Sequence, residues 1–321
     1  MKLKDSIREQ LATPRKVIAV GNPPVSDRVP PSPRTLYHKF IETAQKFADE
    51  ILFVIPSRWF NGGKGLDKFR AATLTEGHVY QLRDFADARA VFPNVDISGG
   101  VCFLHWKKDY TGLCNWSNDQ GNRMQRNLAE YDVFVRDEVS RSIVNKVLSC
   151  HAGEFLSDHG VGRGCSGISS NFKGFQASGV PIYTKGGKIK FVALDNVKNP
   201  HLLGNHLVAA AAAAHAGQAN KDGRQVVISS TMKALPLGTG LSDTYLGFAF
   251  DSEVQAISVA NLLRTRFCQA LILARSNAGM NNKSFSWVPL LDFTQSWDDA
   301  KLAAHFNLTA EEVAYIESKI K

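Results

Sequence analysis

In the first 110 residues, the spacing of apolar and polar positions alternates between patterns typical of strands and patterns typical of helices. Short apolar runs predict buried strands, expected over residues 16–20, 51–55, 79–85 and 98–106. Apolar positions three or four apart predict helices, one over residues 67–74 and an earlier one with an apolar face of Leu36, Phe40, Ala44, Phe47 and Ala48. A charged helix is expected over residues 1–14, and residues 112–117 should return as a hairpin strand. The alternation predicts an α/β fold with half of a doubly wound sheet.

The character of the chain changes near residue 112, where short strand-like runs, glycines and isolated basic residues begin. This change predicts a second domain of mixed α/β structure. Ser252 is expected to begin one long helix. The expected buried face of that helix comprises Val254, Ile257, Leu263, Phe267 and Leu271. Thr309 and Glu312 match a capping box in a helical tail, so the predicted domains are residues 1–111, 112–296 and 297–321.

Composition and charge favour a folded protein with a polyanionic partner. A chain of 321 residues with 44% apolar residues can bury one large or two ordinary cores. The formal net charge of +8 and the pI of about 9.2 favour DNA as that partner. The N-terminus lacks an apolar signal core, and the apolar run at residues 208–216 is too short to span a membrane. A cytoplasmic protein without a membrane partner is therefore expected.

The cysteines and histidines give no metal-binding pattern. Five cysteines are scattered through the chain, without a Cys-x-x-Cys pair or a histidine at zinc spacing, which indicates reduced thiols. His38, His105 and His159 have no companions at ligand spacing, so no metal site is expected.

The segment Asn22-Pro23-Pro24 follows the first apolar run and is the strongest chemical signal in the sequence. The side-chain oxygen of Asn22 and the carbonyl of Pro23 can both accept hydrogen bonds from one amino group. Two prolines fix φ and remove backbone donors, so these acceptors stay rigid. That arrangement suits methylation of an exocyclic amine of adenine or cytosine. The alternative is an ordinary strand-to-turn connection.

The motifs around this turn occur in the order and spacing of a known family. They are Leu36-Tyr37-His38-Lys39-Phe40, Phe53-Val54-Ile55-Pro56-Ser57-Arg58-Trp59-Phe60, Gly62-Gly63-Lys64-Gly65-Leu66, Val91-Phe92-Pro93 and Gly99-Gly100-Val101, with Phe285-Ser286-Trp287-Val288-Pro289 near the end. With them the chain resembles the adenine-N6 DNA methyltransferases of type II restriction–modification systems that have a TaqI-like specificity domain. The resemblance covers most of residues 15–110 and roughly residues 242–321.

The resemblance implies roles for the residues of the turn. Asn22 and Pro23 would accept hydrogen bonds from the target amine, and Pro24 would stiffen the turn. Val25 stands where the family has an aromatic residue that stacks on the extruded base. Phe92 would stack on the other side of that base, unless it is a core aromatic residue. The methyl group would pass directly to the amine, without a covalent enzyme intermediate.

The resemblance also implies S-adenosyl-L-methionine as the cofactor, but its site is incomplete in this sequence. The family places a glycine-rich loop and an acidic residue before the Asn-Pro-Pro turn, where only about twenty residues precede Asn22 here. The segment Gly162-Arg163-Gly164-Cys165-Ser166-Gly167 matches the loop pattern formally, but Lys185 stands where the acid is expected. The fold would be a partial Rossmann-like methyltransferase sheet followed by a mixed α/β target-recognition domain. A split enzyme with a second subunit, a truncated gene and a remnant kept for binding remain alternatives.

Double-stranded DNA is the expected partner, and basic residues are the candidates for phosphate contacts. They are Arg58, Lys64, Arg163, Lys173, Lys185, Lys188 and Lys190. The leading functional hypothesis is site-specific DNA adenine-N6 methylation with a cofactor-binding half supplied by another chain. The alternative is a non-catalytic DNA- or partner-binding protein descended from such an enzyme. Modification of an amino group in RNA is a third hypothesis.

Overall fold

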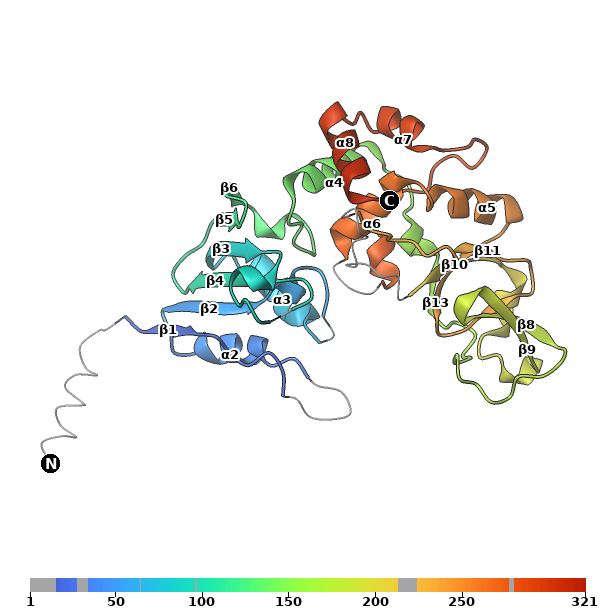
Figure 1. Ribbon diagram of the computed structural model, residues 1–321, viewed down its shortest axis with the longest axis horizontal. Coiled ribbons are helices and arrows are strands. Elements are labelled where there is room, and N and C mark those ends of the chain that lie inside the picture. Colours follow the sequence, from blue (N-terminus) through green and yellow to red (C-terminus); the bar gives the residue numbers. More distant parts are fainter. Residues whose placement is uncertain (1–15, 28–33, 64, 96, 213–223, 277–279) are drawn as a thin grey trace, which may run out of the picture. The chain divides into compact units, whose positions relative to one another are not determined.

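The computed structural model describes residues 16–27, 34–63, 65–95, 97–212, 224–276 and 280–321. The chain divides into two compact units, Met1–Phe134 and Val135–Lys321 (Figure 1). Residues 112–134 therefore belong to the first unit, although the sequence placed a boundary after residue 111. The helix expected over residues 1–14, and Lys64, lie outside the described residues.

The first unit is built on a six-stranded sheet in the order β1-β2-β4-β3-β5-β6 (Figure 1). The strands are β1 Ile18–Gly21, β2 Glu50–Pro56, β3 Val79–Phe85, β4 Val101–Lys107, β5 Cys114–Asn118 and β6 Arg123–Arg126. The pairs β1–β2 and β3–β5 are parallel, and β4 runs antiparallel between β2 and β3. The strands expected over residues 51–55, 79–85 and 98–106 are thus confirmed, in a mixed α/β unit.

Side chains alternate between the two faces of this sheet, and one face carries the core. The helices α2 Tyr37–Ala44 and α3 Asp67–Thr75 contribute to that core, where the rings of Tyr37 and Phe69 meet edge to face with centroids 6.3 Å apart. The core residues contributed by the sheet include Ile51, Phe53, Ile55, Leu82, Leu104, Trp106 and Trp116. Burying each such side chain stabilises the fold by roughly 1.5–3 kcal/mol.

Several expectations about the first unit are wrong. The first strand is an exposed edge strand, because β1 pairs only with β2 among the described residues and 76% of Val20 is accessible to solvent. The helix α2 buries Tyr37 and Ile41, whereas Phe40 and Phe47 are exposed. Residues 112–117 do not return onto β4, since β5 pairs in parallel with β3 and forms its hairpin with β6. These differences arise because local spacing does not reveal which neighbours cover a strand or helix.

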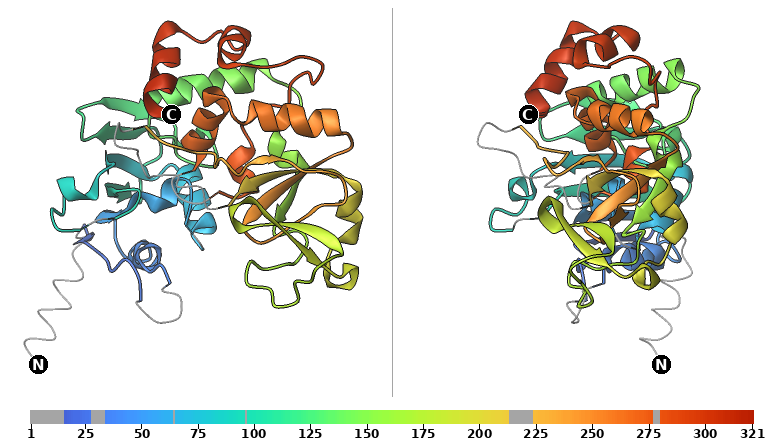
Figure 2. Two further views of the ribbon diagram at one scale, coloured as in Figure 1. Left: turned by 45° about the vertical axis from the view of Figure 1, so that its right-hand side comes forward. Right: turned by 90° about the vertical axis from the view of Figure 1, so that its right-hand side faces the viewer.

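The second unit contains two smaller sheets, in the orders β11-β10-β13-β7 and β12-β8-β9. Their strands are β7 Gly160–Arg163, β8 Val180–Thr184, β9 Lys188–Val192, β10 His206–Ala211, β11 Lys233–Ala234, β12 Gly240–Leu241 and β13 Tyr245–Phe250. The helices are α4 Glu138–Cys150, α5 Glu253–Leu262, α6 Arg266–Arg275, α7 Asp299–His305 and α8 Ala310–Lys319. Within this unit, the β8–β9 hairpin lies at the end opposite α7 and α8 (Figures 1 and 2).

The single helix expected from Ser252 is in fact two helices. Ser252 does cap the first, since its hydroxyl accepts from the Gln255 amide at 3.3 Å. The chain then bends by 76° between α5 and α6, and Thr265 caps the second helix. Val254 and Ile257, expected in the buried face, are exposed. Among the described residues no single helix is long and apolar enough to cross a membrane. Only the bent pair of α5 and α6 together has the length and apolar composition of a membrane-spanning segment.

The capping box at the last helix is confirmed. The Glu312 amide donates to Thr309 Oγ1 at 3.2 Å, and the Thr309 amide donates to Glu312 Oε2 at 2.7 Å. Glu312 also accepts from Ser142 and Lys146 of α4, each at 2.7 Å. The tail predicted over residues 297–321 thus packs within the second unit.

Candidate functional site

The turn that carries Asn22 begins where β1 ends. Asn22 is exposed and Pro23 is buried. The next residues are fastened to the segment before α2, because the Leu36 amide donates to the Val25 carbonyl at 3.0 Å and the Asp27 amide to the Arg34 carbonyl at 3.1 Å. These bonds hold the chain after the two prolines, and the pairing of β1 with β2 holds it before them. Val25, at the position of the family's aromatic residue, is 45% exposed.

Asn22 and Phe92 line the same pocket, of about 570 Å³. Apolar side chains form most of its wall, and the residues that complete it come from four strands and the segment after β3: Val20, Gly21, Leu52, Phe53, Val54, Gln81, Arg83, Val91, Phe103, Leu104 and His105. Phe92 is half-buried and packs against a small cluster that includes Phe85 and Val101. It therefore serves both as a packing residue and as part of the pocket wall.

The carboxyl ends of β2 and β3 and the amino end of the antiparallel β4 are held together beside this pocket. Ser57 donates to the Asp84 carboxylate at 3.2 Å, and both residues are buried. The Ser57 amide donates to the Gly100 carbonyl at 3.0 Å. Gly100 has φ +77°, and a Cβ there would lie 2.0 Å from the Phe85 carbonyl oxygen, so only glycine fits. These contacts fix the strand ends between which the pocket opens.

A carboxylate at the start of β2 anchors the first strand. Glu50 pairs with Lys16, which precedes β1, and with His105 of β4 at 2.7 Å, while Lys107 lies 3.8 Å away. The hydrogen bond from Lys16, then that from His105, lowers the pKa of Glu50 to about 2. His105, for which no role was expected from the sequence, thus joins this ion-pair cluster to the pocket wall.

The face of the sheet opposite the core, here called the open face, changes from apolar to polar across the strands. In register, Val20 and Leu52 lie in one row and Val54 and Phe103 in the next. These four residues are the apolar half. The same two rows continue across β3, β5 and β6, where the side chains are polar. The polar half comprises Gln81, Arg83, Asn115, Ser117, Arg123 and Gln125.

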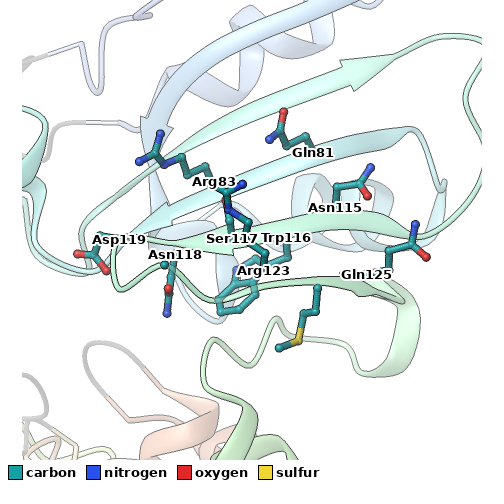
Figure 3. Close-up of a pocket in the computed structure, with 11 residues that line it drawn as sticks. Gln81, Arg83, Asn115, Trp116, Ser117, Asn118, Asp119, Arg123 and Gln125 are labelled. Carbon is teal, nitrogen blue, oxygen red and sulfur yellow. The ribbon is translucent and has the colours of Figure 1, made fainter.

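The polar half lines a second pocket, of about 480 Å³, over β3, β5 and β6. Figure 3 shows Gln81, Arg83 and Asn115 on one side of the sheet, with the ring of Trp116 turned to the other. This polar surface was not predicted from the sequence. Its signal was the alternation of polar and apolar residues along the three strands.

The basic residues proposed to contact DNA do not form one group. Arg58 is exposed at the end of β2, in the 3-10 helix η1 Ser57–Phe60, and does not line the Asn22 pocket. Arg163 ends β7, and its Nε donates to the Asp243 carbonyl at 2.6 Å. Lys173 is an exposed loop residue.

Three of the proposed lysines lie together on the β8–β9 hairpin. They are Lys185, Lys188 and Lys190, and all are exposed. Lys190 also lies over the Phe175 ring, 4.4 Å from its centroid. The hairpin therefore presents a basic, solvent-accessible surface.

The residues present do not complete a site for S-adenosyl-L-methionine. The pocket beside Asn22 has no acidic residue in its wall that could bind a ribose. Gly162 lies within β7, and Gly164 begins the turn that leads to a loop bound to Asp243, so these glycines do not form a strand–helix connection. Within the described ranges there is also no group of three or more His, Cys, Asp or Glu side chains that could hold a metal ion.

Comparison with known proteins gives one family match. Residues 29–92 match the model of the Eco57I restriction-modification methylase family, a stretch that starts beyond the Asn-Pro-Pro turn and ends at Phe92. Of the solved structures, a DrdV–DNA complex matches with 9% identity and a TM-score of 0.39, over 91% of this chain and 44% of that one. The type IIG restriction endonuclease BpuSI matches with 11% identity and a TM-score of 0.31, over 89% of this chain and 44% of that one.

The chain thus spans less than half the length of either structure. No curated protein matches the sequence. Through the segment that contains α2, β2, α3 and β3, the chain is related to restriction-modification methylases.

Proposed function

We propose that this chain supplies the base-binding part of a site-specific DNA adenine-N6 methyltransferase. The observation that supports this most directly is the pocket shared by Asn22 and Phe92 at the carboxyl end of β1. Ligands of open α/β sheets bind at that end of the strands. The match to a methylase family over residues 29–92 agrees with the same chemistry. The sheet would then be part of a Rossmann-like methyltransferase domain.

Asn22 and Pro23 perform the polar part of this function. The side-chain oxygen of Asn22 and the carbonyl of Pro23 accept hydrogen bonds from the adenine amino group and stabilise the positive charge that develops on its nitrogen. The structure records no hydrogen bond from the Asn22 side chain to another described residue, so its oxygen is available to a ligand. Pro24 stiffens the turn, because its ring fixes φ.

Phe92 provides the stacking surface. An adenine amine cannot be reached inside a duplex, so the base must leave the stack at a cost of a few kcal/mol. Stacking on an aromatic ring stabilises the extruded base by roughly 1–3 kcal/mol, which offsets part of that cost. Val25 offers no second ring, so Phe92 carries this contribution without an aromatic partner from the turn.

The second unit is proposed as the target-recognition domain, with the β8–β9 hairpin against the DNA backbone. Lys185, Lys188 and Lys190 are placed to contact phosphates, which position a protein without reading the sequence. Arg58, Lys64, Arg163 and Lys173 are secondary candidates for the same role.

The cofactor site is proposed to be completed by another chain. S-adenosyl-L-methionine supplies the methyl group in this class of enzyme, and the residues present lack the acidic residue and glycine-rich turn that would hold it.

Transfer of labelled methyl groups from S-adenosyl-L-methionine to unmethylated DNA tests this function. The assay is run with the chain alone and with the product of the gene immediately upstream. Asn22→Ala should abolish transfer and leave DNA retention nearly unchanged. Asn94→Ala is the matched control, since Asn94 is exposed near Phe92 but does not line the pocket. Normal transfer by Asn22→Ala would show that the site is assigned wrongly.

A non-catalytic DNA- or partner-binding protein is the second candidate. The observation in its favour is Val25, which replaces a stacking aromatic residue. Retention of DNA without methyl transfer, with or without the second gene product, would support this candidate.

A further inference from the structure

The strands β3, β5 and β6 form a trough on the polar half of the open face. The middle strand β5 carries the short side chains of Asn115 and Ser117, which are half-buried. Longer, exposed side chains flank them on both neighbouring strands: Gln81 and Arg83 on β3, and Arg123 and Gln125 on β6. The pocket of about 480 Å³ is the space between these two walls (Figure 3). A ligand in the trough therefore contacts three strands at once.

Two arginines stand in one row across this trough. Arg83 pairs in register with Ser117, and Ser117 pairs with Arg123. Adjacent strands lie about 4.8 Å apart, so roughly 10 Å separates the Cα atoms of the two arginines, a gap that their side chains can close above Ser117. Two guanidiniums and a hydroxyl supply the donors that the oxygens of a phosphate group accept.

The charges of this row are available to a ligand. In the part of the chain that the structure describes, neither Arg83 nor Arg123 forms an ion pair, although Asp119 lines one end of the trough. The Arg83 guanidinium lies over the Phe85 ring, 5.0 Å from its centroid, which restricts its position. Phe85 belongs to the cluster on which Phe92 packs. The arginine is thus held in place by the same cluster as the proposed stacking residue.

The arginine row leads to the turn that carries Asn22. Asn22 follows Gly21, the last residue of β1, and lies level with Val54 of β2. Val54 belongs to the same row as Arg83. Three strand spacings, roughly 14 Å, separate β1 from β3, and the pocket of about 570 Å³ lies between them. Since Arg83 lines both this pocket and the trough, a base in the pocket and a phosphate in the trough would be neighbours.

We propose that Arg83, Ser117 and Arg123 bind the phosphodiester next to the extruded adenine of the target strand. This inference rests on the proposed function and names the place where the backbone of that strand is held. A phosphate fixed in the trough limits the positions that its base can take and directs the base toward Asn22 and Phe92. The two arginines thus position the nucleotide and take no part in the methyl transfer itself.

The second row of the trough favours nucleic acid over an acidic peptide. This row comprises Gln81, Asn115 and Gln125 and lies roughly 7 Å from the arginines, toward the amino end of β3. Amide side chains both donate and accept hydrogen bonds. They match the sugar and base atoms of a neighbouring nucleotide, whereas a second carboxylate of an acidic peptide would meet no cation in this row.

Binding of single-stranded pentanucleotides to the full chain tests the proposal. The strand has adenine at its centre and thymine elsewhere, and it presents the adenine without the cost of extrusion from a duplex. In one version, the two linkages that flank the adenine are neutral methylphosphonates. In the second version, the two outer linkages are neutral instead. Both versions have the same net charge, so a difference in affinity, measured by isothermal titration calorimetry at low salt, reports on the position of the charge alone.

The version with neutral inner linkages should bind roughly tenfold more weakly than the version with neutral outer linkages. Arg83→Gln and Arg123→Gln should each remove most of this difference. The matched control is Arg89→Gln, which should retain it, because Arg89 is exposed on the same unit but lines neither pocket. Since Arg123 is exposed on β6, its variant should melt like the wild type.

Equal affinity for the two versions would overturn the proposal. So would a difference that persists in both trough variants, or one that is lost equally in Arg89→Gln. Displacement of the fully charged strand by an equal concentration of a pentaglutamate peptide would also overturn it, because the trough would then bind carboxylates without preference for phosphate.

The same variants separate this inference from the proposed function. If the difference between inner and outer linkages depends on Arg123 but methyl transfer does not depend on Asn22, the trough stands and the proposed function fails. If methyl transfer depends on Asn22 but the two versions bind equally, the function stands and the trough is assigned wrongly.

Discussion

Replacing Glu50 by glutamine should loosen the strand that leads to Asn22. Glu50 binds Lys16, which precedes β1, and His105 at 2.7 Å on β4, so it ties the edge strand to the sheet. Only 7% of Glu50 is exposed. Glutamine keeps the shape but removes the charge that both partners stabilise, and it leaves Lys107 without its counter-charge 3.8 Å away.

The magnitude follows from the pKa of the carboxyl group. A pKa of about 2 in place of 4.5 corresponds to about 3.4 kcal/mol, at roughly 1.36 kcal/mol per pKa unit. Lys16, the largest cause, is 60% exposed and screened by solvent, which reduces the expected loss to about 2 kcal/mol. For a unit of this size, that corresponds to a fall in Tm of roughly 6–10 °C.

The sign of the pH dependence is fixed by the lowered pKa. Because the folded-state pKa lies below the ordinary value, the contribution of Glu50 is complete above about pH 5 and is lost as the pH falls from 4.5 to 2. The difference in stability between the wild type and Glu50→Gln should therefore be constant near pH 7 and shrink over that acidic range.

Thermal unfolding, followed by tryptophan fluorescence, measures this difference, and amide exchange in residues 17–21 reports on β1. The control is Arg89→Gln, which breaks the exposed pair with Asp87 and should leave the stability nearly unchanged. A loss no larger than that of the control, or a difference that persists unchanged at pH 2, would refute the reasoning.

Phe92→Ala should weaken capture of an extruded 2-aminopurine by roughly 1–3 kcal/mol, measured by fluorescence, while Phe92→Tyr should retain it; equal signals would assign Phe92 to packing alone. Changing Lys188 and Lys190 to alanine should weaken binding of all DNA sequences and flatten the plot of log K against log salt by about 0.9 per lost phosphate contact; an unchanged slope would exclude them from the interface. Maleimide should modify only Cys150 quickly in the native protein, because the other four cysteines are buried and burial raises the pKa of Cys114 and Cys268 to about 12. Rapid modification of a second thiol would contradict that burial.

The sequence by itself determined the elements that depend on neighbouring residues. The strands β2 and β3, the helix α3 and the capping box of Thr309 and Glu312 formed where local spacing predicted them. The position of Asn22 directly after a strand was readable for the same reason. Each of these features is fixed by residues within a few positions along the chain.

Some local signals were outweighed by packing. The apolar spacing from Val254 to Leu271 continues through the bend at Thr265, so periodicity alone suggested one helix. The side chain of Thr265, which accepts from the Cys268 amide at 3.3 Å, begins a new helix there. The exposure of Phe40 likewise depends on which side of α2 meets the sheet, and Phe47 lies beyond the end of that helix.

Only the tertiary structure decided which strands are neighbours and which surfaces stay uncovered. The insertion of β4 between β2 and β3 brings His105 beside Leu52 and Phe103 beside Val54, and it places both in the wall of the pocket with Asn22. Pairing of this kind joins residues about 50 positions apart, and each strand's own sequence is compatible with several partners. The exposed edge of β1 could not be predicted for the same reason, because an apolar strand sequence predicts burial whether or not another strand lies beside it.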